Sequence, residues 1–324
     1  MLSALLAASS LLALGLNAPH IIVEMTDGEI GEEVSYHEGR VHAPHQAGSI
    51  GKYVCTLAAL RMENEGLIAL DATVAELLPD FTGPNAEDVT LRRLLESRSG
   101  LEDKLIPSLR ADPDLPNKAL PLQMAINEVA VGPAKQAPGV TFDYVNGNWV
   151  LVGAILERAA GEPLAEALQR WVLDPAGMDS AYIIDRALSG PDPVIALEDS
   201  LPLPSFMACA GGLAATATDL LKLSQYPFVS DDFDFDDRMA LQMVTSPEQD
   251  YTLGGRFKLV TDAETGMTRR ISWQSGNNGP WYAFVAYDPA TQNGLAMLTP
   301  DASNGEILLD KRAAWLEAQG LVGE

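Results

Sequence analysis

Histidine and cysteine are scarce in this sequence of 324 residues, and their scarcity excludes several kinds of active site. There are four histidines, and none of them follows position 45. A Ser-His-Asp triad on an α/β-hydrolase fold needs a histidine after its nucleophile and a Gly-x-Ser-x-Gly turn around it. The sequence has neither feature, so a triad of this kind is not expected.

The histidines and cysteines also lack the spacing of a metal site. His37, His42 and His45 share one loop, but no carboxylate or cysteine pattern accompanies them. The two cysteines, Cys55 and Cys209, form no C-x-x-C pair. We therefore expect no metal and no cofactor. We interpret the cysteines as free buried thiols, with a structural disulfide as the alternative.

Positive charge is the third scarcity. The chain has 21 Lys and Arg residues against 45 Asp and Glu residues, a formal net charge of -24. Such a chain repels nucleic acids and anionic membrane surfaces, so neither is expected as a partner. The same field disfavours anionic substrates, and we expect a small-molecule ester, amide or lactam. No pattern predicts the oligomeric state.

Long apolar runs are absent beyond the first 18 residues, and this one is too short and broken for a membrane span. It is either a signal peptide or an amphipathic first helix. No Lys or Arg precedes the run, and Leu16-Asn17-Ala18 is a poor cleavage site, so the helix is slightly favoured. This favours a cytoplasmic location, whereas a signal peptide would imply a periplasmic or secreted one.

The elements that are present place strands at both ends of the chain and helices in the middle. Strands are predicted over residues 20–25, 29–36, 252–260, 269–274, 281–287 and 295–299. Helices are predicted over residues 49–66, 91–96, 122–131, 149–161, 163–172 and 303–319, and around 219–223 after a threonine cap. Residues 102–121, 174–205 and 231–237 are interpreted as irregular or loop segments, the last one acidic.

This order predicts an α+β fold, with an antiparallel sheet built from both chain ends and an inserted helical domain. We expect residues 1–52 and 250–324 to form the sheet domain and residues 53–249 to form a mainly helical domain. The active site would lie between the two.

Ser49 and Lys52 stand at the start of the first long helical pattern, three residues apart and on one face. A serine hydroxyl is a weak nucleophile until a neighbour takes its proton, and a lysine with a lowered pKa can take it. The helix N-terminus also favours negative charge on the serine oxygen. Ser-x-x-Lys is therefore a candidate nucleophile–base pair, and an N-cap serine beside a solvated lysine is the alternative.

Several further segments follow Ser49–Lys52 in a recognisable order. They are Glu65–Pro79, Thr90–Leu101, Tyr144-Val-Asn146, Asp174–Met178 and Gly211–Leu220. Together these motifs resemble one family, the serine β-lactamase and penicillin-binding-protein-like superfamily, and within it the chain is most similar to class C β-lactamase-like serine hydrolases and family VIII carboxylesterases. In the Thr90–Leu101 block, Ser97 stands where the family usually has histidine. The resemblance covers nearly the whole chain and implies the β-lactamase/transpeptidase-like fold.

The third motif of the family departs from its pattern in this chain. The family usually has Lys-Thr-Gly or His-x-Gly on a strand beside the site, and here the segment is Trp273-Gln274-Ser275-Gly276. Gln274 is neutral where the family has a cation that helps to hold a substrate carboxylate. This weakens a β-lactam or D-Ala substrate, unless an arginine reaches the site instead. The candidates are Arg256, Arg269 and Arg270.

The resemblance also implies a role for each site residue. Ser49 would form an acyl-enzyme, Lys52 and Tyr144 would share the proton transfers, and Asn146 would position the acyl group and the lysine. The remaining site residues would bind substrate, with the backbone N–H groups of Ser49 and Asn277 as the oxyanion hole; they are Trp273, Gln274, Ser275, Gly276 and Asn277.

The leading hypothesis is a carboxylesterase acting on small neutral esters. The alternatives are a β-lactamase, a D-amino-acid peptidase or amidase, an acyltransferase, and a non-catalytic binding member of the same fold.

Overall fold

The computed structural model describes residues 20–36, 42–118, 120–184, 203–301 and 305–322. The apolar run at residues 1–18 and the histidine at position 37 lie outside these ranges. None of the helices within them is long and apolar enough to cross a bilayer.

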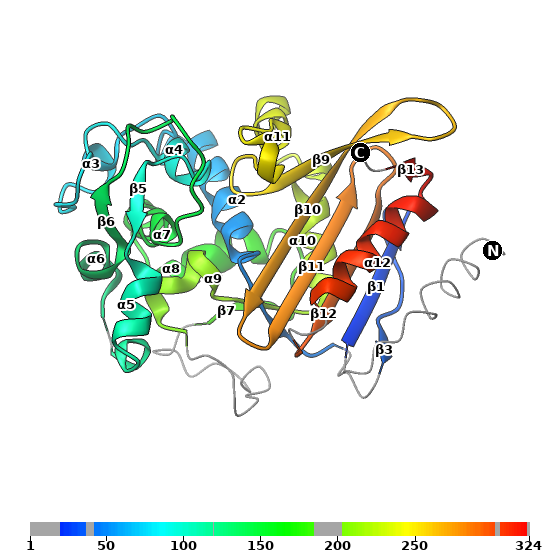
Figure 1. Ribbon diagram of the computed structural model, residues 1–324, viewed down its shortest axis with the longest axis horizontal. Helices are drawn as coiled ribbons and strands as arrows, with labels where there is room; N and C mark the ends of the chain where they lie inside the picture. The colour runs from blue at the N-terminus through cyan, green and yellow to red at the C-terminus, as the bar shows by residue number, and fades with distance from the viewer. Residues whose placement is uncertain (1–19, 37–41, 119, 185–202, 302–304, 323–324) are drawn as a thin grey trace.

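An eight-stranded antiparallel sheet joins the two ends of the chain (Figure 1). Its order is β13-β9-β10-β11-β12-β1-β2, with β3 also paired to β1. The strands are β1 (His20–Thr26), β2 (Glu29–Ile30), β3 (Val34–Tyr36), β9 (Arg256–Asp262), β10 (Thr268–Asn278), β11 (Trp281–Asp288), β12 (Asn293–Thr299) and β13 (Leu321–Val322). The N-terminal and C-terminal strands meet where Ile21 pairs with Leu298. The predicted sheet is confirmed.

Successive side chains of the central strands point to opposite faces of this sheet, and both faces are buried. In β11, Phe284 and Ala286 pack beneath the C-terminal helix α12 (Gly305–Ala318), together with Trp315. Val285 and Tyr287 face the opposite way, into the main core, where α10 (Ala217–Val229) covers the sheet. Figure 1 shows α12 lying across the front of the strands and α10 behind them.

The helices of the other half gather around two buried helices, α2 (Gly51–Asn64) and α7 (Gly147–Ala160). Both are buried along most of their length, so neither has a narrow apolar stripe. The remaining elements there are α3 (Val74–Leu77), α4 (Leu91–Leu95), β5 (Leu101–Asp103), α5 (Leu105–Ala111), α6 (Leu122–Ala125), β6 (Val131–Ala134), α8 (Leu164–Leu168), α9 (Ala208–Gly211) and α11 (Phe235–Gln242). Short 3-10 or π turns cover Leu115–Asn117, Ile126–Ala130, Gln169–Leu173, Ser205–Met207 and Pro247–Gln249.

Several element predictions are wrong in part. The strand predicted over 252–260 begins only at Arg256 and runs to Asp262 as β9, and the segment 174–205, predicted as irregular, contains the short strand Tyr182–Ile183. Residues 102–121 contain the end of β5, helix α5 and a 3-10 turn rather than a loop. The acidic run at 231–237 contains the start of α11, because the Asp234 carboxylate accepts from Asp237 N and the two form a capping box. The strand predicted over 29–36 is broken into β2 and β3. The division into two domains stays a prediction.

Candidate active site

Ser49 lies in the turn between strand β4 (His45–Gly48) and helix α2. Strand β4 belongs to a small sheet with β8 (Leu213–Ala215) and β7 (Tyr182–Ile183). Gly48 has a φ of 53°, and a Cβ at this position would lie 2.6 Å from the backbone nitrogen of Asn277. Only glycine fits such a backbone approach at a positive φ. The turn therefore holds Ser49 against strand β10.

Lys52 is buried in the first turn of α2, with 2% of its surface exposed. Its Nζ lies 3.0 Å from Ser49 Oγ and 3.2 Å from Asn146 Oδ1, and it also donates to the carbonyl of Ala210. The last two partners are amide oxygens, which only accept. In the neutral lysine, the two N–H groups would serve these oxygens, and the lone pair would face the serine hydroxyl.

The ring of Tyr144 lies beside this lysine, with its centroid 5.0 Å from Lys52 Nζ. Burial lowers the pKa of Lys52 from its ordinary value; Tyr144 and Asp103 oppose the shift, and Arg256 adds to it. Burial alone would raise the pKa of Tyr144, but the lysine charge, hydrogen bonding with Ser49 and the Arg256 charge together lower it. Opposed effects of this kind on adjacent buried groups are typical of functional sites.

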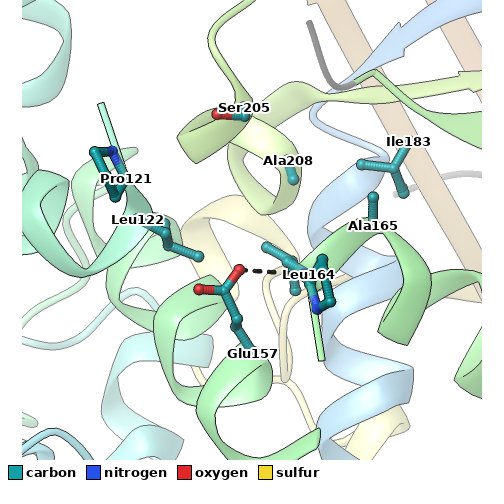
Figure 2. Close-up of a pocket in the computed structure, with 9 residues that line it drawn as sticks. Pro121, Leu122, Glu157, Leu164, Ala165, Ile183, Ser205 and Ala208 are labelled. Carbon is teal, nitrogen blue, oxygen red and sulfur yellow. Dashed lines mark hydrogen bonds between the residues drawn. The ribbon is translucent and has the colours of Figure 1, made fainter. Parts of the chain in front are cut away.

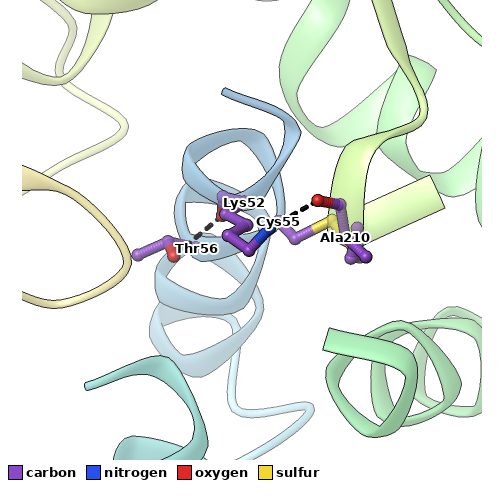
Figure 3. Close-up of a disulfide and its surroundings, with 5 residues drawn as sticks. Lys52, Cys55, Thr56 and Ala210 are labelled. Carbon is purple, nitrogen blue, oxygen red and sulfur yellow. Dashed lines mark hydrogen bonds between the residues drawn. A yellow bond between two sulfur atoms is a disulfide. The ribbon is translucent and has the colours of Figure 1, made fainter. Parts of the chain in front are cut away.

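The two cysteines are bonded to each other, which corrects the prediction of free thiols. Cys55 lies one turn beyond Lys52 on α2, and Cys209 lies on α9, next to Ala210 (Figure 3). The positions are 154 residues apart, so no spacing pattern could show their proximity. The disulfide ties the helix that carries the lysine to the helix that carries its carbonyl acceptor.

The third motif lies on β10, where its residues alternate between the two faces of the sheet. On the face toward α2, a Cβ on Gly276 would lie 2.8 Å from the Ser49 nitrogen. The backbone nitrogens of Ser49 and Asn277 therefore lie close together, where the turn before α2 meets β10. Gln274 is buried with 4% exposure against Gly255 and the Tyr53 ring. It does not supply a charge.

On the other face, the Trp273 ring stacks near Phe284 and under α12, and Ser275 is half-buried. The guanidinium of Arg312 also lies over the Trp273 ring, 5.0 Å from its centroid. The tryptophan thus packs mainly into the core between the sheet and α12.

Arg256 is the arginine that reaches the site. Its guanidinium carbon lies 5.8, 5.3 and 5.0 Å from the ring centroids of Tyr144, Tyr251 and Trp273. It is half-buried, and none of the ion pairs found in the described residues involves it. Arg269 instead pairs with Asp288 at 2.8 Å. Arg270 is exposed on β10, opposite Leu259.

Asp103 is a site neighbour that the motifs did not single out. Its Oδ2 accepts from the backbone nitrogen of Asn146 at 3.1 Å and from Asn146 Nδ2 at 3.4 Å. It follows the Thr90–Leu101 block by two residues, and that position was the available signal in the sequence.

The histidine loop supplies no metal site within the described part of the chain, where no cluster of three His, Cys, Asp or Glu residues could hold an ion. His45 is buried against the ring of Trp281, with centroids 5.0 Å apart. Burial lowers its pKa to about 4, against the raising effect of Glu33. It is therefore a neutral core residue at physiological pH.

A separate pocket of about 230 Å³ lies in the helical half, beside α9 (Figure 2). Its lining combines apolar side chains with polar atoms, and the Glu157 carboxylate, which enters it, accepts from Leu164 N at 3.2 Å. None of the site residues predicted from the sequence lines it. The lining residues are Pro121, Leu122, Glu157, Pro163, Leu164, Ala165, Ile183, Ser205 and Ala208.

Comparisons with known proteins agree with this geometry. The model of the Beta-lactamase family matches residues 31–319, so the chain belongs to the Beta-lactamase family. Esterase EstB of Burkholderia gladioli is 34% identical over 141 residues, which are 40% of this chain and 36% of EstB. D-aminopeptidase of Cereibacter sphaeroides is 32% identical over 165 residues, 47% of this chain and 30% of that protein. The chain thus matches about a third of the length of these curated relatives.

The solved structures show the same fold. A D-stereospecific amidohydrolase from Streptomyces sp. has a TM-score of 0.74 with 18% identity, and the match covers 92% of this chain and 94% of that one. The fold class and the resemblance inferred from the motifs are confirmed.

Proposed function

We propose that this chain is a serine hydrolase that forms an acyl-enzyme through Ser49, and that it acts as a carboxylesterase on small neutral esters. The observation that carries the proposal is the contact of 3.0 Å between Lys52 Nζ and Ser49 Oγ. Burial lowers the pKa of this lysine, so its neutral form can take the serine proton. Membership of the Beta-lactamase family and the similarity to esterase EstB support the same reading.

The proposed reaction begins when Ser49 Oγ attacks the ester carbonyl carbon and its proton passes to the Lys52–Tyr144 pair. The backbone N–H groups of Ser49 and Asn277 bind the oxyanion of the tetrahedral intermediate. The intermediate collapses, the pair returns the proton to the leaving alkoxide, and the alcohol departs. Water then attacks the acyl-enzyme and gives its proton to the pair. When this second intermediate collapses, the pair returns the proton to Ser49 Oγ and the acid departs. Asn146 holds the lysine through Oδ1 during both halves.

The neutral substrate is inferred from charge. Gln274 carries no charge and is buried, and the chain as a whole has a formal net charge of -24, which disfavours an anionic substrate. Along β10, Gly276 would line the strand side of the substrate, because it lies on the face toward Ser49, whereas Ser275 points to the other face of the sheet.

A second candidate is favoured by Arg256, whose guanidinium lies beside Tyr144 and has no ion-pair partner among the described residues. A cation in this position can bind a substrate carboxylate, as a β-lactam or a D-amino-acid peptide would require. The similarity to a D-aminopeptidase supports an amide substrate as well.

The deciding experiment compares hydrolysis of p-nitrophenyl acetate, butyrate and octanoate with hydrolysis of nitrocefin and D-alanine p-nitroanilide, for wild type and Ser49→Ala. We expect ester turnover that disappears in the variant, whose melting temperature stays close to wild type because Ser49 is only half-buried and the substitution removes a single oxygen atom. Faster nitrocefin or anilide turnover would replace the esterase with the second candidate. Ester turnover that gives a new ester in added methanol, rather than acid, would favour an acyltransferase.

The non-catalytic alternative has its own readout. A fluorophosphonate probe should label Ser49 in wild type and leave Ser49→Ala unlabelled. If neither turnover nor labelling is found, the chain is a binding member of the fold and the proposal is wrong.

A further inference from the structure

Two amide oxygens accept hydrogen bonds from Lys52, and a group outside the predicted site contacts the side chain that carries one of them. One of them, Asn146 Oδ1, belongs to a side chain that could equally well turn its nitrogen toward the lysine, because the two ends of an amide have nearly the same shape. Such a turn would set N–H groups against the lysine N–H groups. A contact with some neighbouring group must therefore be the reason that the Asn146 amide keeps its orientation.

Asp103 supplies that reason. A carboxylate only accepts hydrogen bonds, and Asp103 Oδ2 lies 3.4 Å from Asn146 Nδ2, which fixes the nitrogen on the side away from Lys52. The same oxygen accepts from the backbone nitrogen of Asn146 at 3.1 Å. Asn146 is the N-cap residue of α7, and its own side chain makes no capping bond. A carboxylate is favoured at this helix end by the unpaired N–H groups and the helix dipole.

The carboxylate is rigidly placed. Asp103 Oδ1 accepts from Leu105 N at 3.0 Å, and Asp103 pairs with Val131 across strands β5 and β6. Ala130, just before β6, presses on the first turn of α7, since a Cβ on Gly147 would lie 1.7 Å from its carbonyl oxygen. Figure 1 shows β5 and β6 side by side next to α7. These contacts fix β5 and β6 against the first turn of α7, and so fix Asp103 relative to Asn146.

We propose that Asp103 is a positioning residue, whose carboxylate locks the Asn146 amide with Oδ1 toward Lys52. This inference rests on the proposed hydrolase function of Ser49 and Lys52. Asp103 does not touch the reacting atoms; it acts through Asn146, and the lysine lone pair is aimed at the serine as a result.

The charge of Asp103 also has a measurable effect on the pH dependence of the reaction. The charged or titratable groups that act on Lys52 are Tyr144 from the segment before α7, Arg256 from β9 and Asp103 from β5. Asp103 raises the pKa of Lys52, so its removal lowers that pKa further. The acidic limb of the kcat/KM profile, which follows deprotonation of the base, then moves to lower pH.

The test is the pH profile of kcat and KM for Asp103→Asn, with Glu102→Gln as the matched control. Glu102 is the next residue on β5, and it lies near Gly132 rather than Asn146, so its substitution removes the same charge without touching the amide. In Asp103→Asn we expect kcat to fall on the order of 10- to 100-fold with KM nearly unchanged, as for small misplacements of reacting groups. The acidic limb should move to lower pH. Glu102→Gln should leave kcat and KM within about twofold of wild type and the acidic limb where it is.

Two outcomes would overturn the proposal. One is an Asp103→Asn variant that loses melting temperature but keeps the kcat and the acidic limb of wild type, which would make the role purely structural. The other is an equal effect of both variants, which would make it a matter of net charge.

A crystal structure of Asp103→Asn tests the proposal without any substrate. The proposal requires the Asn146 amide to turn or to leave Lys52, and an amide that stays in place contradicts it. Failure of the proposed function is a different result, because wild type would then show neither ester turnover nor labelling at Ser49.

Discussion

Lys52 Nζ donates to the backbone carbonyl of Ala210, which follows directly after the disulfide-bonded residue of α9. Lys52 and Cys55 stand one turn apart on α2, so the disulfide and this hydrogen bond join the same two helices, α2 and α9, side by side (Figure 3). The cross-link thus lies beside the proposed base rather than at the periphery of the fold. Its effect should therefore be visible in activity as well as in stability.

We predict that the double variant Cys55→Ala/Cys209→Ala loses roughly 4–5 kcal/mol of unfolding free energy, because the bond closes a loop of 154 residues. Its kcat should also fall, since the Ala210 carbonyl is no longer tied to the helix of the lysine. Urea unfolding monitored by circular dichroism and ester kinetics at low temperature, where the variant is folded, measure the two effects. A stability loss with unchanged kcat would show that the disulfide only supports the fold.

From the same disulfide we predict that the number of free thiols depends on the compartment in which the protein is produced. Disulfides form in oxidising surroundings and are rare in the reducing cytoplasm. Protein secreted to an oxidising periplasm should show no free thiol under denaturing conditions, and protein from a reducing cytoplasm should show two. Thiol titration in guanidinium counts them. Comparable urea midpoints for the two preparations would contradict a stabilising role for the bond.

For Lys52 we predict that Lys52→Met and Lys52→Arg both slow acylation by at least about 10²-fold, the range for loss of a general base. The methionine is apolar and has no proton acceptor of the required kind, and the arginine stays charged at all accessible pH values. The burst of p-nitrophenol in stopped-flow experiments measures acylation directly. If either variant changes KM alone, Lys52 is not the base.

Removing Arg256 should move the acidic limb of kcat/KM in the direction opposite to Asp103→Asn. Arg256 lowers the pKa values of both Lys52 and Tyr144, so Arg256→Gln raises them and the limb moves to higher pH. The control is Arg270→Gln, which removes the same charge from an exposed position of β10. The pH dependence of butyrate ester hydrolysis gives the result. Limbs that coincide for the two variants would show that Arg256 does not act on the base.

The sheet could be predicted because its central strands are runs of apolar and aromatic residues bounded by turns. Residues 281–287 are an example, and their side chains are buried on both faces of the sheet. Strand β8 was missed because its three residues, Leu-Ala-Ala, are too few to form such a run. Helix α5 was missed because Pro107 lies inside it and aspartates follow it, so local composition favoured a loop.

In the site, motifs identified the residues that lie close in sequence to a conspicuous pattern, and structure was needed for the rest. Ser49, Lys52 and Asn146 are joined by hydrogen bonds, as the resemblance implied. The sequence names Arg256 only as one of three candidate arginines and places Asp103 only beside a motif. That both reach the site follows from the positions of strands β9 and β5 in the fold, which the motifs do not encode. The burial of Gln274 likewise depends on the register of β10, which its neighbours set.

The last prediction concerns His45, whose buried ring should make the fold sensitive to mild acid. Its pKa is about 4 in the folded chain and 6.5 in an unperturbed histidine, so the unfolded state binds the proton first. The stability that this difference provides is complete above pH 6.5 and is lost as pH falls to about 4, by roughly 3 kcal/mol. His45→Leu should flatten the fall between pH 6.5 and 5, where few carboxylates titrate. Urea midpoints across this range measure it, with the exposed His42→Gln as control. Parallel curves for His45→Leu and wild type would mean that another group causes the acid sensitivity.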